Sequence, residues 1–203
     1  MNQYIKTIES RAQCVNIKAE IVLAYLLKEY PRFAYWSGSH NEILHHYGQG
    51  GLAQHTSEVL ELGFSCRSLL HKESEVDAME YFFAALFHDT GKMFDYDIYG
   101  DQKNEQGELV NPRWEPTEHR RLIHHLPRSV LIWHDIISKY PDLNDRYHDS
   151  VVHAILAHHG RREAGSPVAP KTAVAWLLHL CDGISARMDD CDTLDIVHRP
   201  ANV

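Results

Sequence analysis

Apolar residues recur every three or four positions along much of the chain, a spacing that predicts α-helices. The first helix is expected over about residues 3 to 29, where the apolar positions form one stripe. A second helix is expected to begin near Gly51, and its apolar stripe includes His55, which therefore faces the core. A third helix is expected over about 75 to 89, followed by Gly91, a residue type that commonly ends helices in the left-handed conformation.

The helical pattern continues in the second half of the chain. A fourth helical region opens at Thr117, and Pro127 within it should cause a kink or a break. A fifth helix is expected over about 149 to 159 and a sixth over about 170 to 188. Because the sixth segment is apolar nearly all round, we expect this helix to be buried.

The polar, turn-rich segment 94 to 116 is expected to form a short irregular loop or hairpin. No internal repeat, low-complexity stretch or Gly/Ser-rich linker divides the sequence. A chain of 203 residues with 44% hydrophobic composition can bury a sizeable core within one domain. We therefore predict an all-α fold in a single domain over 1–203, with the N-terminal helix packed on a core of about 40–190.

Composition argues against several classes of protein. The net charge of −8 disfavours a broad nucleic-acid-binding surface, which usually needs a basic face. The four cysteines lie far apart without a CxxC pair, so neither a thiolate zinc site nor a dense disulfide framework is indicated. The N-terminus does not resemble a signal peptide, and no apolar run is long enough to span a membrane. These features predict a cytoplasmic protein with no membrane partner.

The candidate chemistry lies in histidines and aspartates with apolar surroundings. The string LFHDTGK places His88 and Asp89 at the end of an apolar helix, and Asp182 lies in the middle of the apolar sixth helix. Helical geometry places His158 and His159 on either side of the buried face of the fifth helix. Because an unpaired buried carboxylate is costly, two such carboxylates beside inward histidines predict a divalent metal. Imidazole and carboxylate without thiolate suit Mn, Fe, Co, Ni or Zn, and Mg is also compatible.

The order of these residues is similar to that of the HD superfamily of metal-dependent phosphohydrolases, which runs H, HD, H, H or HH, and D. Three strings, HHYGQGGLAQH, LFHDTGK and AILAHHGRREAGSPVAPKTAVAWLLHLCDGISARMD, resemble the HD domain of bacterial 3′-to-5′ exoribonucleases and HD domains of conjugation-associated proteins. The resemblance covers about residues 40 to 190 and implies an HD-domain helical bundle. Those exoribonucleases also carry an OB-fold domain, for which this chain is not expected to have room ahead of its first helices. This difference counts against RNA as the substrate, and the choice between a nucleic-acid end and a free nucleotide stays open.

The resemblance also implies roles for individual residues. The expected core metal ligands are His55, His88, Asp89 and Asp182. Asp89 would bridge if a second ion is bound, and the positions that ligate the second ion in two-metal members are matched by His125, His158 and His159. The lysine after HDxG, Lys92, would bind a phosphate of the substrate.

Each of these roles has a structural alternative. The histidines and aspartates could form a hydrogen-bonded cluster that only stabilises the core. His125 and its two partners could contact substrate or orient other ligands instead of binding metal. Lys92 could stabilise a helix C-terminus, where a cation is favourable.

Three further residues are candidate substrate contacts. His45 and His46 flank the entrance to the site in the resemblance, although solvated loop histidines would give the same pattern. Arg187 could neutralise a second phosphate, or it could form a surface ion pair with Asp189 or Asp190.

The leading hypothesis is a metal-dependent phosphohydrolase, either a phosphodiesterase or a phosphatase, that cleaves a phosphoester of a nucleotide or an oligonucleotide end by a metal-activated hydroxide. Its catalytic residues would be Asp89, Lys92 and His125, with Lys92 stabilising phosphoryl charge and His125 protonating the leaving oxygen in a one-metal state. No GxSxG, Walker-type or GxGxxG motif supports other chemistry. The alternatives are a nucleotide-binding or regulatory module without turnover, and a nucleic-acid processing factor that needs a partner.

Overall fold

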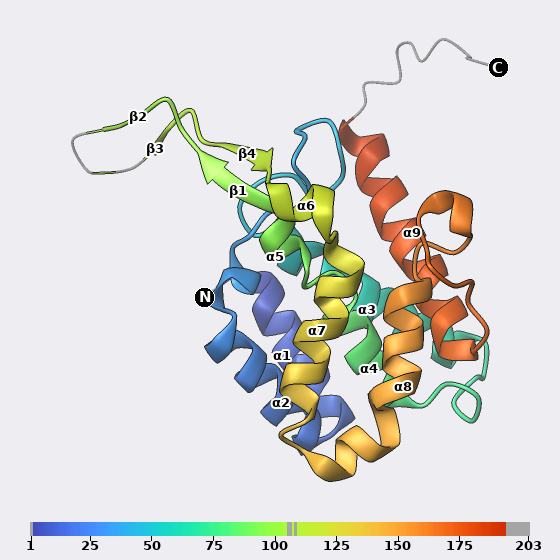
Figure 1. Ribbon diagram of the computed structural model, residues 1–203. Helices are drawn as coiled ribbons and strands as arrows, with labels where there is room; N and C mark the ends of the chain where they lie inside the picture. The colour runs from blue at the N-terminus through green and yellow to red at the C-terminus, as the bar shows by residue number, and fades with distance from the viewer. Residues whose placement is uncertain (1, 105–106, 108, 194–203) are drawn as a thin grey trace, which may run out of the picture.

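The computed structural model describes residues 2–104, 107 and 109–193, with side chains described as far as residue 188. It is a bundle of helices with one projecting β-hairpin arm (Figure 1). The longer helices are α1 (Gln3–Val15), α2 (Ile17–Glu29), α3 (Gly51–Leu69), α4 (Ala78–Phe87), α7 (His125–Ile137), α8 (Pro141–Ala157) and α9 (Ala173–Thr193). The shorter ones are η1 (Pro31–Ala34), α5 (Lys92–Asp95), α6 (Glu118–Leu122) and η2 (Arg162–Ala164). The predicted all-α class is confirmed.

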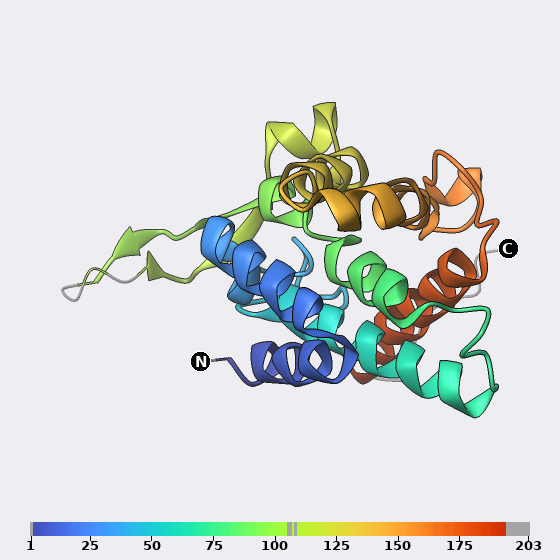
Figure 2. The same cartoon turned by 90° about the horizontal axis from the view of Figure 1, so that it is seen from below.

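Helix α4 lies at the centre of the hydrophobic core. Every residue from Tyr81 to Phe87 is buried, and the helix packs against α1, α3, α7, α8 and α9. Figure 2 shows α4 between α8 on one side and α3 on the other. A helix enclosed in this way delivers the residues that follow it to the interior of the bundle.

The predicted first helix is in fact two helices, α1 and α2. Asn16 separates them with an extended backbone, φ −177° and ψ 151°. Its backbone N–H donates to Ala12, and its side chain accepts from the backbone N–H of Lys18, so it ends one helix and caps the next. The prediction of one helix over 3 to 29 was wrong because both halves bury apolar residues, and the apolar spacing alone does not reveal the cap.

The described part of segment 94 to 116 takes the hairpin form, except that Phe94 and Asp95 belong to α5. Its strands are β1 (Tyr96–Tyr99), β2 (Gln102–Lys103), β3 (Leu109–Val110) and β4 (Arg113–Pro116). Strand β1 pairs antiparallel with β4, and β2 pairs antiparallel with β3. In both views the arm extends away from the helices, while β1 starts directly after α5 (Figures 1 and 2).

Helix boundaries in the second half differ from the sequence expectation at two places. The break in the fourth helical region lies at Ile123 and His124, before Pro127. Pro127 is the third residue of α7, where its missing N–H removes no intrahelical bond. Helix α8 begins at Pro141 rather than near residue 149, with proline at the first helical position.

The expectation that the sixth helix is buried all round was wrong on one face. In α9, Ala175, Leu178 and Cys181 are buried, but Trp176 and Leu180 are 50% and 55% exposed. The buried face packs on α3, α4 and α8. Asp182 follows that face and is directed into the bundle with an 18% exposed side chain.

Candidate metal centre

The turn after α4 places His88 and Asp89 inside the bundle, where both are buried. Gly91 in this turn has φ −62°, so the prediction of a left-handed C-cap there was wrong. A Cβ atom at Gly91 would overlap the backbone carbonyl of His125. Glycine is therefore required by the close approach of α7, which brings His125 beside Asp89.

A first group of side chains converges from three helices. His55 comes from α3, His88 and Asp89 follow α4, and Asp182 comes from α9. The Nε2 atom of His55 lies 3.1 Å from His88 Nε2 and 3.0 Å from Asp182 Oδ1. One ligand atom from each of the four residues lies within 4.8 Å of the others, as a single metal ion requires.

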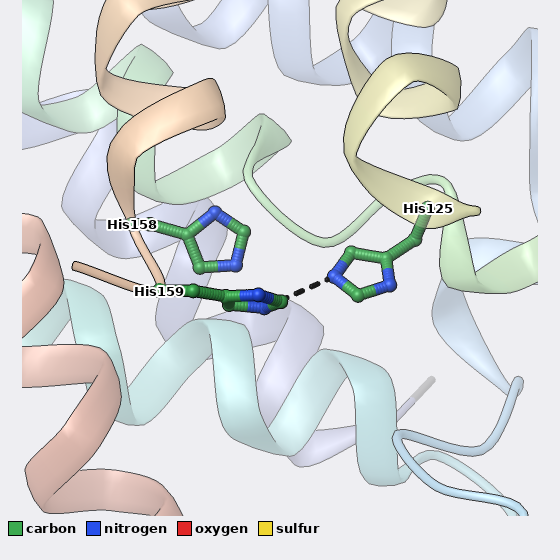
Figure 3. A group of neighbouring side chains, drawn as sticks. All are labelled: His125, His158 and His159. Carbon is green, nitrogen blue, oxygen red and sulfur yellow. Dashed lines mark hydrogen bonds between the residues drawn. The ribbon is translucent and has the colours of Figure 1, made fainter. Parts of the chain in front are cut away.

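A second group consists of three histidines (Figure 3). His125 opens α7, and His158 and His159 directly follow α8. The Nε2 atoms of His125 and His159 are 3.2 Å apart, and one nitrogen of each of the three rings lies within 4.8 Å of the others. Three imidazoles at this spacing could hold a transition metal through nitrogen atoms.

Asp89 joins the two groups through its two carboxylate oxygens. Oδ2 lies 3.4 Å from His55 Nε2 and 3.4 Å from His88 Nε2. Oδ1 lies 3.5 Å from His125 Nε2 and 3.6 Å from His158 Nε2. A carboxylate in this position can bridge two ions.

Two buried polar atoms at this junction lack hydrogen bonds within the described part of the chain. They are Asp89 Oδ1 and His158 Nε2, which face each other. An unsatisfied buried polar atom costs free energy, and both atoms are good metal donors. The donor set therefore fits a divalent cation better than it fits a closed hydrogen-bonded cluster.

Backbone carbonyls fix the orientation of two histidines of these groups, His88 and His158. Nδ1 of His88 donates to the carbonyl of Ala85 at 2.8 Å, and Nδ1 of His158 donates to that of Ile155 at 2.7 Å. With the proton held at Nδ1, the lone pair at Nε2 points to the centre, the arrangement common in metal-binding histidines.

His55 is oriented through a hydrogen-bonded chain of side chains. Its Nδ1 atom lies 3.0 Å from Ser185 Oγ, and the Ser185 hydroxyl donates to Glu58 Oε2 at 2.7 Å. Burial would raise the pKa of Glu58, but hydrogen bonds from His46 and Ser185 outweigh it and lower the pKa to about 2. Glu58 and Ser185 also line part of a groove of about 450 Å³ between α3 and α9.

His125 is oriented by a buried carboxylate that the sequence analysis did not select. Asp95 Oδ2 lies 3.3 Å from His125 Nδ1, and Asp95 Oδ1 lies 2.9 Å from His119 Nδ1. The Nε–H of Arg128 donates to His119 Nε2 at 3.0 Å. Asp95 thus holds the ring of His125 with Nε2 facing the other two histidines.

Lys92 forms a buried ion pair with Asp89, its Nζ lying 2.7 Å from Asp89 Oδ2. Burial favours the neutral form of Lys92, but attraction to Asp89 outweighs it and raises the pKa of the ammonium. Burial likewise opposes ionisation of Asp89, but Lys92 and His88 outweigh it and hold the Asp89 pKa well below its usual range. Both groups are therefore charged at neutral pH, and the ammonium is directed to the centre.

Burial lowers the pKa of three histidines in the two groups, whereas attraction to Asp89 outweighs burial and raises the pKa of His88. Burial lowers the pKa of His55 to about 4, and burial together with His125 lowers that of His159 to about 4. Burial also places the pKa of His158 well below its ordinary value. Neutral imidazoles have the lone pair that metal binding needs.

The three candidate substrate contacts lie in different surroundings. His46 is 3% exposed and its Nε2 lies 2.9 Å from Glu58, so it is not a solvated loop residue. His45 is partly exposed, with its ring centre 5.8 Å from that of His55. Arg187 is exposed on α9, and the side chains of Asp189 and Asp190 lie outside the described residues. All three stay predictions as substrate contacts.

The orienting residues that the sequence analysis missed share one spacing. Glu58 follows His55 by three residues, Asp95 follows Lys92 by three, and Ser185 follows Asp182 by three. Residues three apart lie on the same face of a helix. A polar residue three positions after an expected site residue was therefore the sequence signal that could have identified these three orienting residues.

Comparison with known proteins gives a family and a set of relatives. The HD domain family matches residues 52–187. The proteins named 3′-5′ exoribonuclease YhaM are 29% identical over 87% of this chain in Geobacillus sp. (strain WCH70), and 26% identical over 91% in Oceanobacillus iheyensis. These matches cover 49% and 53% of the two relatives, so the chain spans about half their length.

No solved structure matched the chain. In the described part of the chain, no helix combines the length and apolar character needed to cross a membrane.

Proposed function

Since this chain belongs to the HD domain family, we propose that it is a metal-dependent phosphohydrolase that cleaves a phosphoester of a nucleotide or of an oligonucleotide end. The family and the two groups of histidine and aspartate residues support a metal-dependent hydrolase. The kind of phosphoester and the role of each residue belong to the proposal.

The observation that carries the proposal is the position of Asp89. Its carboxylate lies between the two groups, and Oδ1 is buried without a hydrogen-bond donor among the described residues. A purely structural cluster would leave this oxygen unsatisfied, at a cost of about 1 to 3 kcal/mol. A cation bound between the groups would remove that cost.

The proposed ligand sets follow from the two groups. One divalent ion would be held by His55, His88, Asp89 and Asp182, and a second by Asp89 with His125, His158 and His159. When bound, such ions supply Lewis acidity and lower the pKa of a water molecule towards neutrality. The donor atoms suit Mn, Fe, Co, Ni or Zn, and they do not decide between one ion and two.

The chain's own side chains would act on the substrate in two ways. The ammonium of Lys92 is charged and close to Asp89, so it would stabilise the negative charge on the phosphoryl oxygens. In a form with one ion, the Asp95 carboxylate at Nδ1 would stabilise the doubly protonated ring of His125, and this ring would give its Nε2 proton to the leaving oxygen.

A nucleic-acid end is the substrate class that we favour. The relatives are named as 3′-5′ exoribonucleases, and this chain matches about half of each. Because the net charge is −8, recognition of a short end is more consistent with this chain than binding along a long backbone.

Hydrolysis of simple reporters tests the proposal. Chelator-stripped protein should hydrolyse bis(p-nitrophenyl) phosphate or p-nitrophenyl phosphate only after Mn²⁺ is added, and Asp89→Asn should abolish this activity. The preference between the two reporters separates a phosphodiesterase from a phosphatase. Asp145→Asn is the matched control, because Asp145 is an exposed aspartate on α8.

The negative outcome would be equally informative. Bound Mn²⁺ without turnover of either reporter would favour a nucleotide-binding module or a factor that needs a partner. Equal turnover by the wild-type and Asp89→Asn proteins would overturn the proposed role of the centre.

A further inference from the structure

Arg120 is a charged side chain near the candidate metal centre with no role in the proposed hydrolysis. Its Nη1 atom donates to Nε2 of His40 at 3.2 Å, and its guanidinium lies 5.5 Å from the ring centre of Tyr96. Within the described ranges, no carboxylate lies at ion-pair distance from it. Several other arginines of this acidic chain are paired with carboxylates, namely Arg11, Arg113, Arg121 and Arg146.

Tyr96 connects Arg120 to the centre. It directly follows α5, whose first residue is Lys92, and it is 6% exposed. Burial raises the pKa of Tyr96, while Lys92 and Arg120 both act on it electrostatically in the opposite direction. Arg120 also directly follows His119, whose Nδ1 lies 2.9 Å from Asp95 Oδ1, and the other oxygen of Asp95 contacts His125. Arg120 therefore lies on the element that packs next to the centre, one residue from a side chain that contacts Asp95.

His40 holds the guanidinium in place without neutralising it. The His40 ring stacks on Tyr96 with ring centres 5.4 Å apart and planes at 27°. Because Nε2 of His40 accepts from Arg120, the ring is neutral, and burial together with Arg120 lowers its pKa. A guanidinium has five N–H donors, and those not used by His40 can bind an anion.

We propose that Arg120, positioned by His40 and Tyr96, binds a second phosphate group of the substrate, next to the phosphate that is cleaved. This inference rests on the proposed function. It predicts a preference for substrates with two or more phosphates, such as an oligonucleotide end or a nucleoside polyphosphate. Arginine suits this role because its planar fork matches two phosphate oxygens.

A pair of dinucleotides tests the subsite. Both have the same scissile bond, and only one has a 5′-phosphate. For the Mn²⁺-loaded wild-type protein, kcat/KM should be higher for the phosphorylated dinucleotide by about tenfold or more, as expected for one charge-assisted pair. Arg120→Ala should remove this preference and leave kcat/KM for the unphosphorylated dinucleotide within about twofold, because Arg120 contacts only the second phosphate.

Two control variants and a second substrate pair sharpen the test. Arg121→Ala should keep the preference, since Arg121 is exposed and paired with Glu118. Arg120→Lys should retain part of it, because the charge remains and the fork is lost. Comparing kcat/KM for a nucleoside triphosphate and its monophosphate shows which kind of second phosphate is bound. If Arg120→Ala removed the preference in this pair alone, the subsite would bind a polyphosphate.

The remaining outcomes separate this inference from the proposed function. The subsite would be overturned if Arg120→Ala lowered kcat/KM equally for both members of each pair, or if the wild-type protein did not prefer the phosphorylated member. Either result would leave the proposed hydrolysis intact. If no substrate is hydrolysed, calorimetric binding of the same dinucleotides still decides the matter. Tighter binding of the phosphorylated dinucleotide that Arg120→Ala removes would support the subsite, and equal binding by both proteins would overturn it.

Discussion

The ammonium of Lys92 lies 2.7 Å from the Asp89 carboxylate in the interior of the bundle. Both partners are buried, at 8% and 2% exposure. The pair places a permanent positive charge beside the carboxylate that joins the two groups. It balances part of the charge of the aspartates and leaves Oδ1 of Asp89 directed to His125 and His158.

Removing Lys92 should destabilise the metal-free protein and weaken hydrolysis. Lys92→Met leaves the buried Asp89 without its cation, and we expect the free energy of unfolding to fall by about 3 kcal/mol. Mn²⁺ should restore part of this loss, because a metal replaces the missing charge. Denaturant unfolding with and without Mn²⁺ measures both effects.

The matched control for that variant is Lys139→Met, which removes an exposed lysine paired with Asp135. It should change stability little, since exposed ion pairs contribute little. A Lys92→Met protein as stable as the wild type without metal would contradict the assignment of the buried pair.

The Ser185 hydroxyl should contribute to metal affinity without touching the metal. Ser185→Ala breaks the chain from His55 to Glu58, so His55 loses the partner that fixes its Nε2 towards the centre. We expect Mn²⁺ affinity to fall by about tenfold, a typical effect of losing an orienting partner. Titration with a competing chelator measures it. Ser138→Ala, an exposed serine, is the control, and equal affinities for both variants would refute the role of Ser185.

Two glycine substitutions should have opposite effects. Gly91→Ala would place a methyl group against the His125 carbonyl, and we expect a loss of about 2 kcal/mol in stability together with weaker metal binding. Gly183→Ala meets no atom within 4 Å in α9, so it should stabilise the protein by about 0.5 to 1 kcal/mol. Thermal and denaturant unfolding compare the two. A Gly91→Ala protein as stable as the wild type would contradict the tight contact between the α4–α5 turn and α7.

Stability of the metal-free protein should decrease as the pH falls from 6.5 to about 4, the interval between the ordinary histidine pKa and the lowered pKa of His55 and His159. In that interval the unfolded chain takes up protons that the folded chain does not. The pKa of His88 is raised, so its protonation favours the folded state as the pH falls. This one stabilising shift is outnumbered by the lowered pKa values of His55, His158 and His159.

Unfolding free energies at pH 7.5 and pH 5 test this expectation. The metal-free protein should lose roughly 2 kcal/mol for each strongly shifted histidine between these values. His159→Gln should reduce the pH dependence. Greater stability at pH 5 than at pH 7.5 would show that the histidines are not held neutral in the folded state.

The ligand set could be anticipated from sequence because each member conflicts with its surroundings. Asp89 and Asp182 interrupt apolar helices, and His55 lies on an apolar stripe. The structure brings these residues together, although their function as ligands stays a prediction. The family was also accessible, since the order of the histidines and aspartates distinguishes it.

The parts that escaped sequence reasoning depend on tertiary contacts. In the sequence, Asn16 resembles any other polar position, and only the structure shows that its side chain caps α2. The exposed face of α9 carries Trp176 and Leu180, and hydropathy does not separate it from the buried face. Arg120 resembles its neighbour Arg121 in sequence, and only the packing of Tyr96 and His40 distinguishes the two.

The most direct test of the central claim is the rate of phosphodiester hydrolysis as Mn²⁺ is titrated into chelator-stripped protein. We predict no activity without metal, a rate that rises and saturates at one or two equivalents per chain, and no rise for Asp89→Asn. Hydrolysis that is independent of Mn²⁺, or an Asp89→Asn protein that responds like the wild type, would contradict the account.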